Sequence, residues 1–143
     1  MLIRNILEES VRKFDEVKAV KWLKKKEIME RSYGELMENV VSTRKGLLAE
    51  GFEGKHIALI GTSSVEWMES YLGIITGCTT AVPLDAALPC EDLIDLLNRS
   101  DSVALFLSPK LKPYLDAFLE NCPKLQKVWM LQEEVEDAPA KVY

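Results

Sequence analysis

Apolar positions are densest between residues 55 and 89, and this stretch predicts a strand, a helix and a second strand. The nearly continuous apolar run His56–Ile60 is typical of a strand buried on both faces of a parallel sheet. A helix follows, because apolar residues recur at three- and four-residue steps at Val65, Met68, Leu72 and Ile75. The second strand, Thr79–Val82, ends at Pro83. Two strands joined by one helix predict a right-handed parallel βαβ unit instead of a hairpin.

Before this unit, the pattern predicts a helix, a β-hairpin and a second helix. The first helix is expected over Leu2–Phe14, and the two strands over Lys18–Leu23 and Glu27–Ser32. The Lys24–Lys26 run then forms the tip of the hairpin. Such a tip is normally a solvated turn, and the functional alternative is contact with anionic lipid or phosphate. Ser32 followed by Glu35 is a capping box, which predicts that the second helix begins here.

After Pro83, alternating helices and strands continue to residue 131. A loop over Leu84–Leu88 leads to Pro89 at the start of a helix whose apolar residues are Leu93, Ile94, Leu96 and Leu97. Strands over Val103–Leu107 and Lys127–Leu131 enclose a helix over Lys110–Asn121. The fold class is therefore α/β: an open parallel sheet with helices on both faces, preceded by a helix and a β-hairpin. This portion is expected to cover residues 1–131, with residues 132–143 as an acidic loop or truncated tail.

Composition limits the classes of protein. The chain has 143 residues, 48% apolar, which fits one globular domain, and a net charge of −5 argues against a nucleic-acid partner. No apolar run approaches about 20 residues, so no transmembrane segment is expected. Cys78, Cys90 and Cys122 are widely spaced, which favours reduced thiols in a cytoplasmic protein; peripheral membrane association is compatible with this location. A zinc site is not expected, because the chain has one histidine and no Cys-x-x-Cys motif.

One turn has the composition of an anion-binding site. Thr62, Ser63 and Ser64 follow the first parallel strand and precede a helix. Open α/β sheets bind anions at this position, where a strand ends and a helix begins. These three residues are therefore a candidate anion-binding turn. The alternative is plain helix capping, the ordinary role of serine and threonine here.

Several short motifs follow one another in a fixed order: Tyr-x-Glu-Leu within Ser32–Val40, then Glu66-Trp67, Gly73, Gly77, Val82-Pro83-Leu84 and Pro89. Together they resemble the N-terminal domain of the AMP-forming adenylate synthetases, most of all the long-chain fatty acyl-CoA synthetases. The resemblance extends from about Ile3 to Leu131. It implies an ATP-dependent enzyme that activates a fatty acid or another carboxylate as an acyl-adenylate and transfers it to CoA.

The same resemblance implies ATP, magnesium and CoA as cofactors of a longer parent enzyme, with the remainder of that synthetase as partner. The Ser/Thr/Gly-rich phosphate loop, the magnesium motif and the C-terminal catalytic lysine of the family do not occur in this sequence. We therefore expect no catalytic residue, no metal ligand and no bound cofactor in this chain alone. In related acetyl-CoA synthetases, the loop matching Asp85, Ala86 and Ala87 contributes glycines near CoA. These residues are a candidate CoA-side loop, or else they only shape the next helix.

Two other classes of protein compete with this reading. A receiver-like signalling domain would use Asp85 as its phosphoacceptor, but it needs an acidic pair after its first strand to bind magnesium. Ile60, Gly61 and Thr62 provide none. A non-catalytic α/β interaction module is the third class. We also expect the chain to self-associate as a homodimer, because an edge strand that the rest of a synthetase would cover is otherwise left open.

Overall fold

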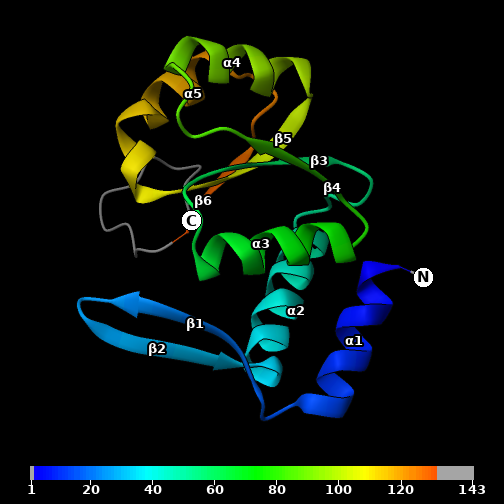
Figure 1. The fold of residues 1–143 in the computed structure, drawn as a ribbon. Helices are drawn as coiled ribbons and strands as arrows, with labels where there is room; N and C mark the ends of the chain where they lie inside the picture. The colour runs from blue at the N-terminus through cyan, green and yellow to red at the C-terminus, as the bar shows by residue number, and fades with distance from the viewer. Residues whose placement is uncertain (1, 132–143) are drawn as a thin grey trace.

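The computed structural model describes residues 2–131, in which a parallel sheet lies between two layers of helices (Figure 1). The elements, with η1 a 3₁₀ helix, are α1 (Ile3–Phe14), β1 (Lys18–Lys24), β2 (Glu27–Ser32), α2 (Tyr33–Ala49), β3 (His56–Ile60), α3 (Val65–Thr76), β4 (Thr80–Leu84), α4 (Cys90–Arg99), β5 (Ser102–Leu107), η1 (Pro109–Tyr114), α5 (Leu115–Asn121) and β6 (Lys127–Met130). The predicted order of elements is confirmed.

The predicted capping box starts α2. The Ser32 hydroxyl accepts a hydrogen bond from the backbone N–H of Glu35 at 3.1 Å, and the Glu35 carboxylate accepts one from the N–H of Ser32 at 2.7 Å. The bond from the Ser32 backbone is the main reason why the pKa of Glu35 is lowered. At its other end, α2 stops before Gly51, whose φ of 75° suits glycine. Local sequence thus fixes both ends of this helix.

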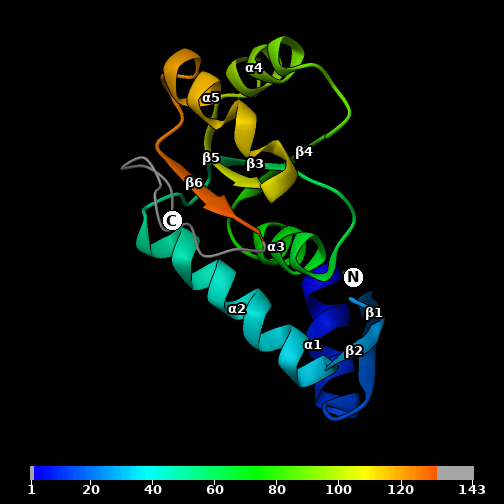
Figure 2. The same ribbon diagram turned by 90° about the vertical axis from the view of Figure 1, so that its left-hand side faces the viewer.

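The four parallel strands lie in the order β4-β3-β5-β6. The chain moves from β3 to β4 in one direction, and then crosses back over β3 to β5. Because parallel crossovers are right-handed, this reversal places α3 on one face of the sheet and α4 and α5 on the other. Figures 1 and 2 show the two helical layers on either side of the strands. The fold class predicted from the sequence is therefore confirmed.

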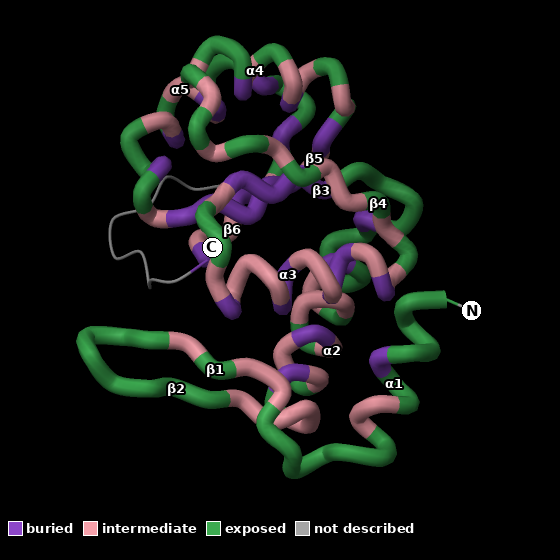
Figure 3. Tube along the Cα trace, in the orientation of Figure 1, coloured by how far each residue is buried: buried purple, intermediate pink, exposed green. Residues whose placement is uncertain are grey.

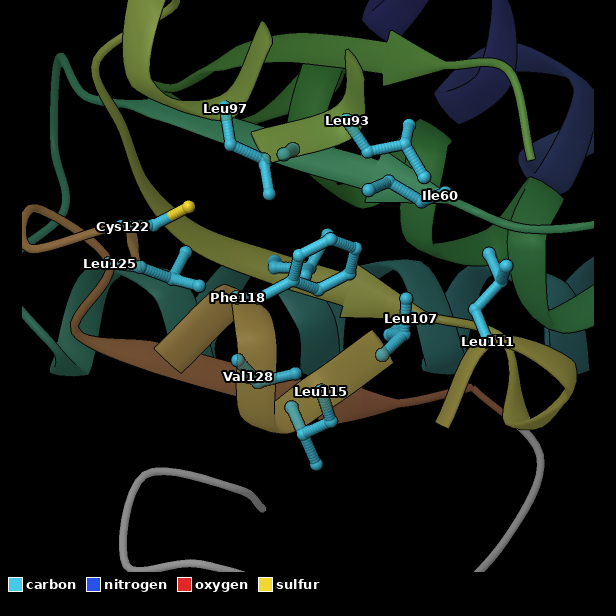
Figure 4. Close-up of a cluster of buried hydrophobic side chains, with 12 residues drawn as sticks. Ile60, Leu93, Leu97, Leu107, Leu111, Leu115, Phe118, Cys122, Leu125 and Val128 are labelled. Carbon is cyan, nitrogen blue, oxygen red and sulfur yellow. The ribbon is translucent and has the colours of Figure 1, made fainter. Parts of the chain in front are cut away.

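Strand β3 is buried on both faces. Ile57 and Leu59 pack with α2 and α3, whereas Ala58 and Ile60 pack with α4 and α5, and all four side chains are 0% exposed. Buried residues concentrate along the central strands in Figure 3. Figure 4 shows the cluster on the side of α4 and α5, in which Phe118 lies among leucines from these helices and from the strands. The predicted burial of this strand on both faces is confirmed for Ile57 to Ile60.

Helix α3 packs on two sides. Trp67 and Ile74 lie against the sheet, while Met68 and Leu72 lie against a smaller cluster formed with α1 and α2. The helices α2 and α3 approach closely because Gly73 has no side chain: a Cβ there would lie 2.6 Å from the Cβ of Thr43. Apolar residues on two sides of α3 are therefore packed.

Two of the predicted boundaries were wrong because of prolines. Strand β4 continues through Pro83 to Leu84, because β4 is an edge strand and a proline there costs no ladder hydrogen bond. The helix expected over Lys110–Asn121 is divided into η1 and α5, with Pro113 inside η1. Proline lacks the N–H that a continuous α-helix requires.

Some apolar residues of the predicted elements remain accessible to solvent. Leu96 is only half-buried and lies outside the cluster that contains Leu93 and Leu97. Among the described residues, the large exposed apolar side chains lie on α1, on the following turn, on the hairpin and at the end of α2, and not on the edge strand β6. The acidic segment 132–143 lies outside the described residues. No helix within residues 2–131 has the length and apolar character needed to cross a bilayer.

The substitution Ile57→Ala should lower the free energy of unfolding by about 2–5 kcal/mol, because it leaves a cavity in a strand closed on both faces. Urea denaturation followed by circular dichroism measures the change. The matched control is Ile28→Ala, at a strand isoleucine that is 72% exposed, which should change stability by no more than about 0.5 kcal/mol. Equal denaturation midpoints for Ile57→Ala and the wild type would contradict the placement of this strand.

Candidate functional site

Three loops meet at the carboxyl edge of the parallel sheet. Ile60 of β3 is in register with Leu84 of β4 and Leu107 of β5, so the segments that follow all three strands start at the same edge. The connections that follow β3 and β4 run in opposite directions along the sheet. The carboxyl ends of the neighbouring strands β3 and β5 therefore form a topological switch point. Open α/β sheets bind ligands at such points. This edge is therefore the candidate site.

The candidate anion-binding turn lies at this switch point. The Ser64 hydroxyl accepts a hydrogen bond from the N–H of Trp67 at 3.0 Å and so caps α3. The N–H of Thr62 donates to the hydroxyl of Ser108 at 3.2 Å. The side chains of Thr62 and Ser63 are exposed. The capping role of Ser64 is thus realised, and anion binding by the turn stays a prediction.

Ser108 is the residue of this edge that the sequence analysis missed. It is 3% exposed, its N–H donates to the carbonyl of Ile60 at 2.9 Å, and its hydroxyl lies beside Gly61. A Cβ at Gly61 would clash with the Ser108 Oγ, so a side chain at Gly61 would displace Ser108. Ser108 therefore locks the ends of β3 and β5 together. Its position directly after a buried strand and before Pro109 was the available sequence signal.

The candidate CoA-side loop begins one strand away, after β4. The Asp85 carboxylate accepts a hydrogen bond from the N–H of Ala87 at 2.9 Å, and the Asp85 carbonyl accepts one from the N–H of Leu88 at 3.2 Å. Asp85 and Ala87 are exposed, whereas Ala86 packs against the cluster beneath α4 and α5. These contacts close the loop before α4. A role near CoA stays a prediction.

A cavity of about 450 Å³ lies beside the switch-point turn. One wall is the hairpin, through Trp22, Leu23 and Lys24, and the other is the start of α3 together with Pro109. Sequence reasoning did not place the hairpin next to this turn, because no local pattern reports a contact over some 40 positions. The hairpin therefore borders the candidate site.

A buried acidic residue ties the hairpin to the body. The Glu69 Oε1 of α3 lies 2.8 Å from the Nε of Arg31 in β2 and accepts a hydrogen bond from the Asn39 amide of α2 at 3.0 Å. The Arg31 guanidinium also lies 5.4 Å from the centroid of the Trp22 ring. The Glu69 side chain is 8% exposed, and this burial raises its pKa, although Asn39 and Arg31 act in the opposite direction. The cluster fixes one wall of the cavity.

The remaining polar chemistry gives no metal centre. No group of three histidine, cysteine, aspartate or glutamate side chains within residues 2–131 is placed to bind a metal ion. All three cysteines are free thiols: Cys78 is exposed, Cys90 is half-buried and Cys122 is buried. Burial raises the pKa of Cys90 and of Cys122, so both stay protonated at neutral pH.

The sequence model of the AMP-binding enzymes matches residues 7–142, nearly the whole chain. The chain belongs to the AMP-binding enzyme family. The predicted resemblance to the N-terminal part of adenylate-forming enzymes is confirmed. A search of curated proteins gives no match.

Solved structures share the fold of this family member. Coronafacic acid ligase from Pectobacterium brasiliense matches with a TM-score of 0.86 and 20% identity, over 99% of this chain and 28% of that one. The N-terminal domain of FACL13 from Mycobacterium tuberculosis matches with 0.81 and 18% identity, over 98% and 38%. The anthranilate CoA ligase AuaEII, bound to anthranoyl-AMP, matches with 0.80 and 18% identity, over 91% and 25%. The chain thus spans about a quarter to two-fifths of these proteins.

The substitution Glu69→Gln should change how stability depends on pH. Because burial raises the pKa of Glu69 above its ordinary value of 4.5, its contribution to the free energy of unfolding is complete below pH 4.5 and is lost as the pH rises through the folded pKa. Urea denaturation at a series of pH values should therefore show the wild type losing stability relative to Glu69→Gln over this window.

The control for this comparison is Glu38→Gln, which removes an exposed carboxylate next to Asn39 on α2. The change in the pH dependence of the free energy of unfolding should be larger for Glu69→Gln than for Glu38→Gln. If the wild type instead gained stability relative to Glu69→Gln as the pH rose, the attraction of Arg31 would outweigh burial and the assigned direction would be wrong.

Proposed function

We propose that this chain is the N-terminal portion of an ATP-dependent acyl-CoA synthetase. The parent enzyme would activate a fatty acid or another carboxylate as an acyl-adenylate and transfer the acyl group to CoA in the cytoplasm. The observation that carries this proposal is the match of the AMP-binding family over residues 7–142. The fold shared with a CoA ligase bound to anthranoyl-AMP supports the same reaction class.

In this proposal, the chain contributes part of the structural framework of the enzyme and none of its catalytic groups. Adenylate formation requires cations near the α-phosphate, where the carboxylate oxygen attacks and pyrophosphate leaves. At the edge described above, the Ser64 hydroxyl and the Thr62 N–H already bond to Trp67 and Ser108. No acidic cluster suited to magnesium is present among residues 2–131. We therefore assign ATP, magnesium and CoA binding to the complete enzyme.

The receiver-like alternative is less well supported. Its phosphoacceptor would be Asp85, whose carboxylate instead accepts a hydrogen bond from its own loop at Ala87. The described part of the chain provides no set of three metal-ligating groups beside it. Fatty acids are the substrate class that the sequence motifs favour. A series of carboxylates in the assay below decides between fatty acids and others.

The proposal is tested by a pyrophosphate-release assay with ATP, magnesium, CoA and carboxylates from acetate to long-chain fatty acids. Two proteins are compared: this chain, and the complete product of the reading frame that encodes it. The complete product should release pyrophosphate only when a carboxylate is present, and the chain alone should not. Turnover by the chain alone that follows the protein through purification would contradict the proposal, as would a complete product that is inactive with every carboxylate.

A further inference from the structure

The hairpin formed by β1 and β2 has a charge opposite to that of the rest of the molecule. Residues 18–32 contain five lysines and one arginine against two glutamates, a net charge of +4, whereas the whole chain carries −5. All other residues together therefore carry −9. At the base of the hairpin, Glu30 lies 3.3 Å from Lys21 and 4.0 Å from Lys18. Lys24, Lys25 and Lys26 against Glu27 give the tip a net charge of +2, and Glu66 of α3 lines the same cavity as Lys24.

The tip is a tight turn made of lysines. Lys24 pairs with Glu27, so Lys25 and Lys26 form a two-residue connection, with φ values of 48° and 68°. Such turns require positive φ at both central residues and strongly favour asparagine and glycine. Lysines at these two positions make the turn less stable than asparagine or glycine would. This arrangement presents three consecutive ammonium groups at the end of the hairpin.

An apolar pair lies next to these lysines. Leu23 and Ile28 are directly opposite each other in the hairpin and are 71% and 72% exposed. Closer to the body, Trp22 and Arg31 are half-buried, and Arg31 is fixed by Glu69. Figures 1 and 3 show the tip extending away from the helices, with both strand ends exposed. The hairpin is thus held at its base. Leu23 and Lys24 also line the cavity beside α3, and Leu23 and Ile28 still remain largely exposed at the tip.

We propose that this tip, Leu23 to Ile28, docks on the surface of an anionic lipid bilayer. Leucine and isoleucine side chains gain by entering the interface between head groups and acyl chains, and adjacent lysines contact the phosphates. A nucleic acid would engage the lysines but leave Leu23 and Ile28 in water, whereas a bilayer takes up both the lysines and the apolar pair. The net charge of −9 on the residues outside the hairpin disfavours broad contact with any polyanion. A projecting tip contacts a bilayer while these residues stay away from the membrane surface. Docking of the hairpin tip does not depend on the proposed reaction.

Vesicle flotation of the whole chain tests the proposal, with vesicles of phosphatidylcholine alone or of an equal mixture with phosphatidylserine. The chain should float with the anionic vesicles and not with the neutral ones, and added salt should weaken the binding. Replacing Lys24, Lys25 and Lys26 by glutamine should reduce partitioning by about fivefold per lysine. The double variant Leu23→Ser and Ile28→Ser should also lose binding, although its charge is unchanged.

The matched controls are Lys45, Lys110 and Lys112 replaced by glutamine, which changes the net charge equally at exposed sites outside the hairpin, and Leu48→Ser, at an exposed leucine of α2. Both should bind vesicles like the wild type, and all variants should keep the wild-type circular dichroism spectrum. Equal loss in the control lysine variant, equal binding by the serine variant, or absence of binding to anionic vesicles would each overturn the proposal. Binding to heparin without binding to vesicles would assign the tip to a polyanion instead.

Discussion

The burial of β3 on both faces is the constraint on which the rest of the structure depends. Four consecutive side chains, from Ile57 to Ile60, are completely excluded from water, and they alternate between two separate clusters. One helical layer can cover only one of these faces, so the chain must place helices on both. Right-handed crossovers achieve this when the strand order reverses, and the reversal creates the switch point between β3 and β5. The site follows from the way the core is closed.

The features predicted from the sequence are those set by neighbours along the chain. The run His56–Ile60 and the pair of Ser32 and Glu35 each contain, within a few residues, the period or the bond that defines the element. The errors at Pro83 and Pro113 arose because the effect of a proline depends on its surroundings. At a sheet edge it is tolerated, and inside a helix it tightens or ends the turn.

The candidate site was only partly predictable for the same reason. Ser64 could be identified as a cap because its partner, Trp67, is three residues away. The contacts of Ser108 and of the Arg31–Glu69 pair could not, because the partners are 46 and 38 positions apart in sequence. The place of Ser108 after a buried strand marks its position at the sheet edge but not its partner. Glu69 looks like an ordinary exposed residue of a helix until α2 and the hairpin cover it. Such long-range polar contacts determine how the hairpin borders the sheet edge.

At the sheet edge, the Thr62 N–H and the hydroxyls of Ser64 and Ser108 hold the loops together and are thereby taken from any ligand. Nucleotide binding would then require groups beyond those of this chain. Isothermal titration of the purified chain with ATP and magnesium tests this most directly. No saturable heat of binding is expected. A one-site isotherm that is lost when Thr62→Val and Ser63→Ala are introduced would contradict this expectation, because the switch-point turn would then be a nucleotide site in its own right.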